Sequence, residues 1–195
     1  MTLKNIPLLL LIGILALPFN GTIAASTAIQ EADMKIIGVR LDSQPMVFVT
    51  ETTSMEAISA FMGPAFAKLG QFLATSGVTA LGPPMAVYHD WSGEMTAVDL
   101  GFPVSATDAE KATGEVLAGM TPGGYALKIV HIGPYDDFAA TYAAIGDAMK
   151  AAGVPEGSKM WEVYLSEPGV TPDAELVTEI FVAVSEQDAA KFPRE

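Results

Sequence analysis

The chain contains no cysteine, which excludes disulfide bonds, thiol catalysis and a lipid-modified N-terminal cysteine. Histidine is almost as scarce, and with only His89 and His131 available a zinc site is not expected. Basic residues are also few, since 10 Lys and Arg stand against 23 Asp and Glu. Nucleic-acid binding needs a basic face, so nucleic acid is not an expected partner. The acid excess is typical of a soluble protein, or of one that attracts cations.

The sequence also lacks the short motifs of common enzyme and cofactor sites. It has no G-x-S-x-G nucleophile elbow, no P-loop and no G-x-G-x-x-G dinucleotide loop. We therefore expect neither a cofactor nor a metal. What the sequence does have is a hydrophobic content of 50% over 195 residues, which is enough for one folded domain with its own core.

The N-terminal segment 1–26 has the layout of a secretory signal peptide. Lys4 is followed by an uninterrupted apolar run from Ile6 to Leu17 and then by a stretch of small residues. The run is too short to span a bilayer as a helix. The sequence thus predicts a cleaved leader over 1–26, a tail over 27–33 and a periplasmic or secreted protein. The alternative is a membrane anchor that is not cleaved.

Hydrophobic periodicity predicts the secondary structure of the remaining chain. Apolar runs predict strands over residues 34–41, 46–52, 85–89, 95–104, 115–120, 125–132, 161–165 and 176–184. Apolar residues at helical spacing predict two helices, one ending at Gly77 and one at Gly153. Gly63 and Pro64 lie inside the first helix and predict a kink or a restart, because proline has no N–H to donate.

The two halves of the chain repeat each other. When they are aligned, Asp99 meets Glu179 and Tyr88 meets Tyr164, with short length differences in the first helix region and in the last strand connection. Each half reads strand, strand, helix, strand, strand. A repeat of this length indicates duplication of one half and predicts a domain with a pseudo-two-fold axis.

We therefore expect a single α+β domain over residues 34–188, followed by a C-terminal tail over 189–195. Its two pseudo-symmetric halves would be 34–106 and 114–186, each an antiparallel sheet with one long helix on one face. A pseudo-two-fold axis places equivalent residues across from each other. The expected ligand cleft between the halves is therefore lined by tyrosines, with an acid on each side.

Glu179 is the single acid in an otherwise apolar last strand. Burying an ionised and unpaired acid costs several kcal/mol, so Glu179 either faces water or meets a cation or a hydrogen-bond donor. Burial would raise its pKa, and a bound cation would lower it again. Plainer interpretations remain open: the tyrosines as strand packing, Asp99 facing solvent, and His131 as a hydrogen-bonded structural residue.

Five segments together resemble a known family. They are LGPPMAVYHD (81–90), VDLGFPV (98–104), GGYALKIVHIGPYDDF (123–138), MWEVYLSEP (160–168) and TEIFVAV (178–184). In this order they resemble the GyrI-like small-molecule-binding domain, which is also the effector-binding domain of multidrug-responsive transcription activators. The resemblance covers about residues 34–186.

The resemblance implies two pseudo-symmetric halves with a ligand cleft between them. It also implies an acid in the last strand that meets cationic, aromatic ligands, and here that acid is Glu179. The family's cleft tyrosines correspond to Tyr88 and Tyr164. The acid of the first half is the shorter Asp99. The full set of expected ligand-binding residues is Glu179, Tyr164, Trp161, Glu162, Tyr88, Asp99 and Phe181.

The leading hypothesis is an exported, stand-alone binding protein for amphipathic, cationic aromatic molecules. A signal peptide in place of a helix-turn-helix segment argues against transcriptional control. The first alternative is a hydrolase of strained electrophilic compounds, with Glu179 as general base and Tyr164 as its partner. The second is an envelope interaction protein whose cleft is vestigial.

Overall fold

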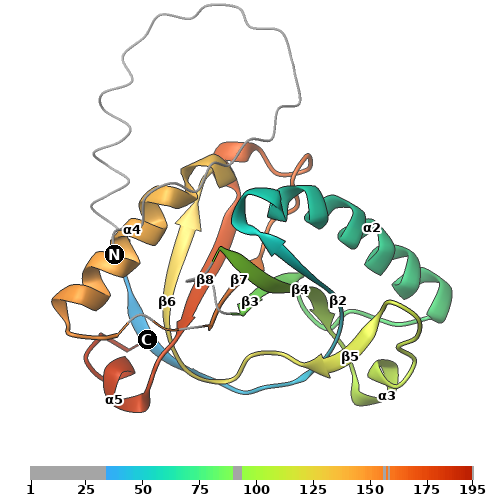
Figure 1. Ribbon diagram of the computed structural model, residues 1–195, viewed down its shortest axis with the longest axis horizontal. Helices are drawn as coiled ribbons and strands as arrows, with labels where there is room; N and C mark the ends of the chain where they lie inside the picture. The colour runs from blue at the N-terminus through green and yellow to red at the C-terminus, as the bar shows by residue number, and fades with distance from the viewer. Residues whose placement is uncertain (1–33, 90–93, 156, 158, 195) are drawn as a thin grey trace, which may run out of the picture.

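The computed structural model describes residues 34–89, 94–155, 157 and 159–194 (Figure 1). The expected leader over 1–26 and the tail over 27–33 lie outside these residues. Within the described residues, no helix is both long and apolar enough to cross a membrane.

The described chain forms the elements that the periodicity predicted, with boundaries shifted by a few residues. The strands are β1 (Ile37–Leu41), β2 (Pro45–Ser54), β3 (Met85–His89), β4 (Met95–Pro103), β5 (Leu117–Met120), β6 (Gly124–Ile132), β7 (Lys159–Tyr164) and β8 (Val177–Ala183). The helices are η2 (Met55–Ala57), α2 (Ile58–Ser76), α3 (Ala106–Ala109), η3 (Tyr135–Asp137), α4 (Phe138–Ala151), η4 (Asp173–Glu175) and α5 (Glu186–Ala189). The expected restart at Pro64 is absent, since α2 runs unbroken through it.

Both long helices end at the predicted glycines. Gly77 and Gly153 have φ values of 59° and 62°, in the left-handed region that glycine adopts without steric cost. Each helix then leads into the third strand of its half. This local chemistry explains why the two helix ends could be located from sequence alone.

A short capped turn that the sequence interpretation missed ends each half. Ser105, Asp108 and Lys111 around α3 recur at the equivalent positions of the second half as Ser185, Asp188 and Lys191 around α5. Each serine hydroxyl accepts the backbone N–H of its aspartate, at 3.0 Å in α3 and 3.1 Å in α5. Each lysine donates to the carbonyl of the glycine that ends the long helix of its half.

The C-terminal residues that were expected as a tail are tied to the first strand. The backbone N–H of Gly38 donates to the carbonyl of Pro193 at 2.8 Å. A Cβ on Gly38 would lie 2.1 Å from the carbonyl oxygen of Ala189, so the two segments approach more closely than any side chain at position 38 would allow. The segment after α5 therefore packs on β1.

The strands form one antiparallel sheet in the order β1-β6-β8-β7-β3-β4-β2-β5. This confirms the α+β class. The two expected half-sheets are continuous, because β3 pairs with β7 at the centre. The order reads the same from either end when β1–β4 are matched to β5–β8. The first strand of each half pairs with a strand of the other half, since β1 pairs with β6 and β5 pairs with β2. Superposition of the halves stays a prediction.

The two faces of the sheet are covered differently. Helices α2 and α4 lie on the same side, and their residues Leu69 and Ile145 share one large apolar cluster with the strands (Figure 1). The other face has a smaller cluster around Trp161. That cluster includes Met46 of β2 and Ala126 of β6, from opposite halves of the strand order. The sheet therefore curls on its helix-free side and buries that face without a helix.

Candidate ligand-binding site

A buried acid, Glu162, lies at the centre of the sheet on the face that carries the helices. Its exposed fraction is 2%. Tyr88 and Tyr164 donate hydrogen bonds to its Oε2 at 3.0 Å and 2.5 Å, and Tyr142 donates to its Oε1. Three phenols from β3, β7 and α4 thus converge on one carboxylate.

The sheet register explains this convergence. Glu162 pairs with Ala86, and Tyr88 pairs with Met160, on the two strands where the halves meet. Residues that are directly paired or two positions apart share a face of a sheet, so Tyr88, Glu162 and Tyr164 all point the same way. Tyr142 comes down from the overlying α4, where it belongs to the apolar stripe of that helix.

Further aromatic rings surround the three phenols. Phe66 of α2 and Tyr135 of η3 meet the Tyr164 ring edge-on, with centroids 6.2 Å and 5.9 Å away. Phe138 lies 5.8 Å from Tyr142 and 5.3 Å from Tyr135. These outer rings are half-buried, whereas Glu162 and Tyr164 are buried. The carboxylate therefore lies beneath a layer of partly exposed aromatic side chains.

The electrostatics of Glu162 follow from its burial. Loss of water raises its pKa from 4.5 to about 7, although the hydrogen bonds from Tyr164 and Tyr88 act in the opposite direction. Burial, and then the nearby charge of Glu162, raises the pKa of both Tyr88 and Tyr164, which keeps them protonated as donors. Among the described residues no Lys, Arg or His forms an ion pair with Glu162.

The expected key acid, Glu179, lies on the opposite face. It pairs with Val163 across β7 and β8, so it points away from Glu162 and Tyr164. Its Oε1 lies 2.6 Å from Nζ of Lys128. Of the alternatives that the sequence left open for Glu179, the structure has the cationic partner, and the protein itself supplies it.

The other expected residues divide between the two faces in the same way. Trp161 and Phe181 stack on the helix-free face, with centroids 5.2 Å apart and planes 6° apart. Asp99 is on this face as well, where its Oδ2 lies 2.7 Å from Nε2 of His89. Of the predicted ligand-binding residues the structure brings together Glu162, Tyr164 and Tyr88. The others are behind the sheet.

The model of the GyrI-like small molecule binding domain matches residues 34–185. The chain belongs to the GyrI-like family. No curated protein matches it. Among solved structures this GyrI-like chain is similar to the EcmrR C-terminal domain, with 19% identity and a TM-score of 0.64 over 78% of this chain and 98% of that one.

Two further solved structures share the GyrI-like fold. SAV2435 bound to tetraphenylphosphonium is 12% identical, with a TM-score of 0.62 over 80% of this chain and 96% of that one. A hydrolase encoded by lin2189 from Listeria innocua is 16% identical, with a TM-score of 0.53 over 77% of this chain and 92% of that one. At these identities the likeness establishes the fold.

Two corrections follow for the GyrI-like site. The expected hydrolytic pair of Glu179 and Tyr164 lies on opposite faces of the sheet, so the two side chains cannot act on one atom. Tyr142 was missed as a site residue, although a phenol inside the apolar stripe of a helix was a visible signal.

His131 has the structural role that its plainer interpretation predicted, with Nδ1 2.8 Å from Oγ1 of Thr141 and Nε2 3.2 Å from the Pro134 carbonyl.

Proposed function

We propose that this protein binds amphipathic, cationic aromatic molecules at Glu162. The observation that supports this most directly is a buried carboxylate with three phenol donors and no basic partner among the described residues. Phenols stabilise a carboxylate but leave its negative charge uncompensated. A cation with apolar rings would compensate the charge and stack on the surrounding aromatic side chains.

Entry of such a ligand requires movement of the aromatic layer. Tyr135, Phe138 and Tyr142 belong to η3 and α4, and all three are partly exposed. Rotation of these rings would open a path to Glu162 without disturbing the strands. A cation would also compete with the proton that Glu162 holds below about pH 7. We therefore expect its affinity to fall about tenfold for each pH unit below that value.

The choice of probe follows from a structural neighbour. SAV2435 has been solved with tetraphenylphosphonium, a cation surrounded by four aromatic rings. The same ion would place its charge at Glu162 and its rings against Phe66 and Tyr135. It is therefore the first compound to test on this chain.

Titration calorimetry at pH 8 tests the assignment with two matched variants. Glu162→Gln should weaken tetraphenylphosphonium binding by about 1.5–3 kcal/mol, the scale of the attraction between two unit charges about 6–10 Å apart at an effective dielectric constant of about 20. The affinity for triphenylphosphine oxide, which is neutral, should fall much less in the same variant. Glu179→Gln should leave both affinities unchanged. The reverse pattern, with loss in Glu179→Gln alone, would return the ligand role to Glu179.

We further propose that the protein is exported. The basis is the sequence layout of residues 1–26 alone. Mass spectrometry of periplasmic and secreted fractions should find a chain that begins between Ala25 and Ile29. Recovery of intact chain from the cytoplasm would contradict export, and recovery from the membrane would favour the uncleaved anchor.

A second candidate function is hydrolysis at the same site. A carboxyl with a pKa of about 7 is suited to act as a general base, and Tyr164 is hydrogen-bonded to it at 2.5 Å. Glu162 would activate water, and Tyr164 would donate a proton to the opened ring of a strained substrate. Incubation with styrene oxide tests this, because hydrolysis must yield the diol and must disappear in Glu162→Gln.

A further inference from the structure

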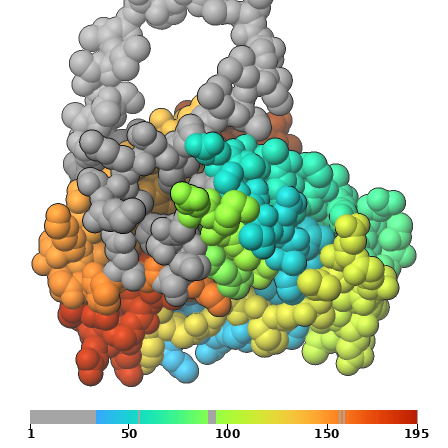
Figure 2. Space-filling view, viewed as in Figure 1, coloured from blue at the N-terminus to red at the C-terminus, as the bar shows by residue number. Residues whose placement is uncertain are grey.

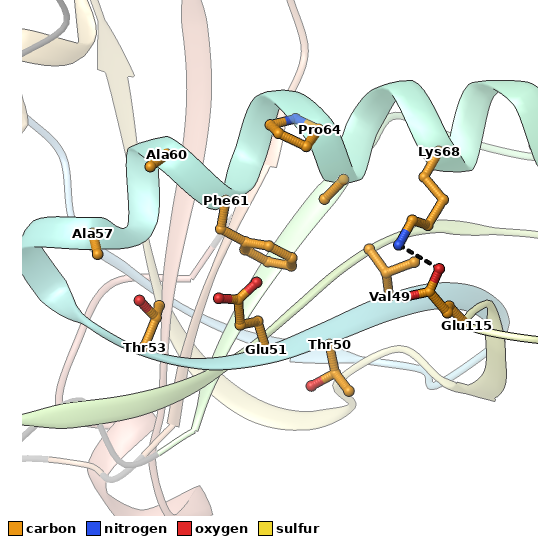
Figure 3. Close-up of a pocket in the computed structure, with 11 residues that line it drawn as sticks. Val49, Thr50, Glu51, Thr53, Ala57, Ala60, Phe61, Pro64, Lys68 and Glu115 are labelled. Atoms are coloured by element: carbon orange, nitrogen blue, oxygen red, sulfur yellow. Dashed lines mark ion pairs between the residues drawn. The ribbon is translucent and has the colours of Figure 1, made fainter.

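A cavity lies outside the Glu162 site, on the outer edge of α2. It has a volume of about 330 Å³ and is bounded by α2, by β2 and by Glu115, which precedes β5. Figure 3 shows its side chains, and Figure 2 shows the teal α2 and the cyan β2 meeting the yellow-green segment around β5. We call it the α2–β2 groove. Its volume is at the small end of the range for ligand pockets.

The groove lies where the first half lacks a hydrogen bond that the second half has. In the second half His131 reaches from β6 to Thr141 of α4 and fills the space between strand and helix. In the repeat, Glu51 occupies the position equivalent to His131. Phe61 occupies the position equivalent to Thr141, because η2 and η3, and likewise α2 and α4, begin 80 residues apart. A phenyl ring cannot form the hydrogen bond that Thr141 forms, so the Glu51 carboxylate borders the groove without that partner.

Three acceptors belong to residues that line the groove. Glu51 points beneath the ring of Phe61 (Figure 3), and none of the described basic residues pairs with it. Thr53 is only 7% exposed, yet its hydroxyl has no hydrogen-bond partner among the described residues. Pro64 has no N–H, so the carbonyl of Ala60 lacks its usual donor in the helix.

This set of acceptors matches a primary ammonium group. An ammonium offers three N–H donors and no acceptor. Glu51 supplies the negative charge, while Thr53 and the Ala60 carbonyl supply the further oxygens. A buried hydroxyl without a hydrogen-bond partner costs free energy. A ligand that donates a hydrogen bond to it removes this cost, which favours binding.

The rest of the groove limits what the ammonium can carry. Ala57, Phe61 and Pro64 provide an apolar wall beside Glu51. At the far end Lys68 forms an ion pair with Glu115 at 2.8 Å. Because Lys68 already neutralises Glu115, a second cation in the ligand would find no unpaired acid at that end, so diamines and polyamines gain no advantage. The groove therefore suits a monoamine with a short apolar body.

We propose that the α2–β2 groove is a second small-molecule site, specific for apolar primary monoamines. It is separate from the Glu162 site, because Phe66 faces Tyr164 whereas Phe61 and Pro64 face the groove. The protein would then hold a bulky cation near its centre and a small amine at the edge of α2. The second site does not depend on the function proposed for the first.

Chemical-shift mapping on the ¹⁵N-labelled protein tests the second site. The probes are 3-methylbutylamine, which has a short apolar body and no aromatic ring, and the neutral 3-methylbutan-1-ol. The amine should shift the amides of Glu51, Thr53, Phe61 and Lys68. Glu51→Gln should weaken amine binding about tenfold, the lower end expected for a hydrogen bond to a charged group, and should leave the alcohol unaffected. Thr53→Val, which keeps the side-chain shape, should weaken binding of the amine by a smaller factor.

Glu162→Gln separates the two proposals. It should leave amine binding unchanged while tetraphenylphosphonium binding falls, and Glu51→Gln should do the opposite. The second site is wrong if the amine shifts only residues around Glu162, if it shifts none, or if Glu51→Gln leaves its affinity intact. A full amine response together with no tetraphenylphosphonium binding would reject the first proposal and keep the second.

Discussion

Two glutamates on neighbouring strands, Glu162 and Glu179, interrupt apolar sequence in the same way and end in opposite environments. Glu162 lies beneath α2 and α4, where phenols are its only described hydrogen-bond donors. Glu179 lies on the helix-free face against the ammonium of Lys128. The Lys128 ammonium is also 6.0 Å from the centre of the Phe181 ring.

The difference shows how the partner of an acid determines its use. A lysine neutralises the carboxylate, so Glu179 has no charge left for a ligand. Phenols solvate the carboxylate without neutralising it, so Glu162 retains affinity for a proton or a cation. The residue that looked most exceptional in the sequence is therefore the one that the protein satisfies internally.

The largest expected effect is on the pH dependence of stability. The pKa of Glu162 is higher in the folded protein, at about 7, than its ordinary value of 4.5. The folded state therefore holds the proton more tightly. This stabilisation is complete below pH 4.5 and is lost as the pH rises through 7, which amounts to about 2–3 kcal/mol between pH 5 and pH 8.

Urea unfolding at both pH values measures this contribution. Glu162→Gln should lose less stability than the unchanged protein between pH 5 and pH 8, by about that amount. Glu179→Gln serves as the matched control, and its unfolding free energy should fall between pH 5 and pH 8 as much as that of the unchanged protein. Equal declines in all three proteins would mean that Glu162 does not titrate in this range.

Removal of one phenol should have the next largest effect. Tyr164→Phe deletes a donor to Glu162, and at pH 8 the ionised carboxylate should make this cost about 2 kcal/mol of unfolding free energy. At pH 5 the carboxyl is neutral and the cost should be nearer to about 1 kcal/mol. Tyr125→Phe is the control, because Tyr125 donates to Glu186 at an exposed position. A cost at Tyr164 that does not change with pH would contradict the charged hydrogen bond.

The ion pair on the other face should contribute less. The side chains of Lys128 and Glu179 are 18% and 22% exposed, so solvent screens their attraction. A double-mutant cycle with Lys128→Met and Glu179→Gln should give a coupling of about 0.5–1 kcal/mol. Tetraphenylphosphonium affinity should not change in either variant. A loss of affinity in Lys128→Met would show that the two faces are coupled.

The smallest effect is expected at Asp99. Its contact with His89 is partly exposed, with side-chain exposures of 37% for His89 and 20% for Asp99. Asp99→Asn keeps an acceptor for the histidine, and chemical unfolding should detect a change below about 0.5 kcal/mol. Ligand binding should also be unaffected. A larger loss, or weaker binding of a cation, would restore Asp99 to the site.

The sequence by itself determined the elements and their repetition, because both depend on local chemistry. Apolar spacing distinguishes a strand from a helix, and a glycine in the left-handed region ends α2 at the expected place. The alternation of side chains along β7 is enough to place Glu162 and Tyr164 on one face and Trp161 on the other, as the structure has them. The same local reasoning could have found the repeated Ser-x-x-Asp-x-x-Lys turn.

Only the tertiary structure decided which acid belongs with the tyrosines. That choice depends on the register between β7 and β8, in which Val163 stands opposite Glu179. A shift by a single position would have turned Glu179 toward Tyr164, because successive residues of a strand point to opposite faces. The register is set by packing of the whole curled sheet and its helices. No pattern within either strand contains that information.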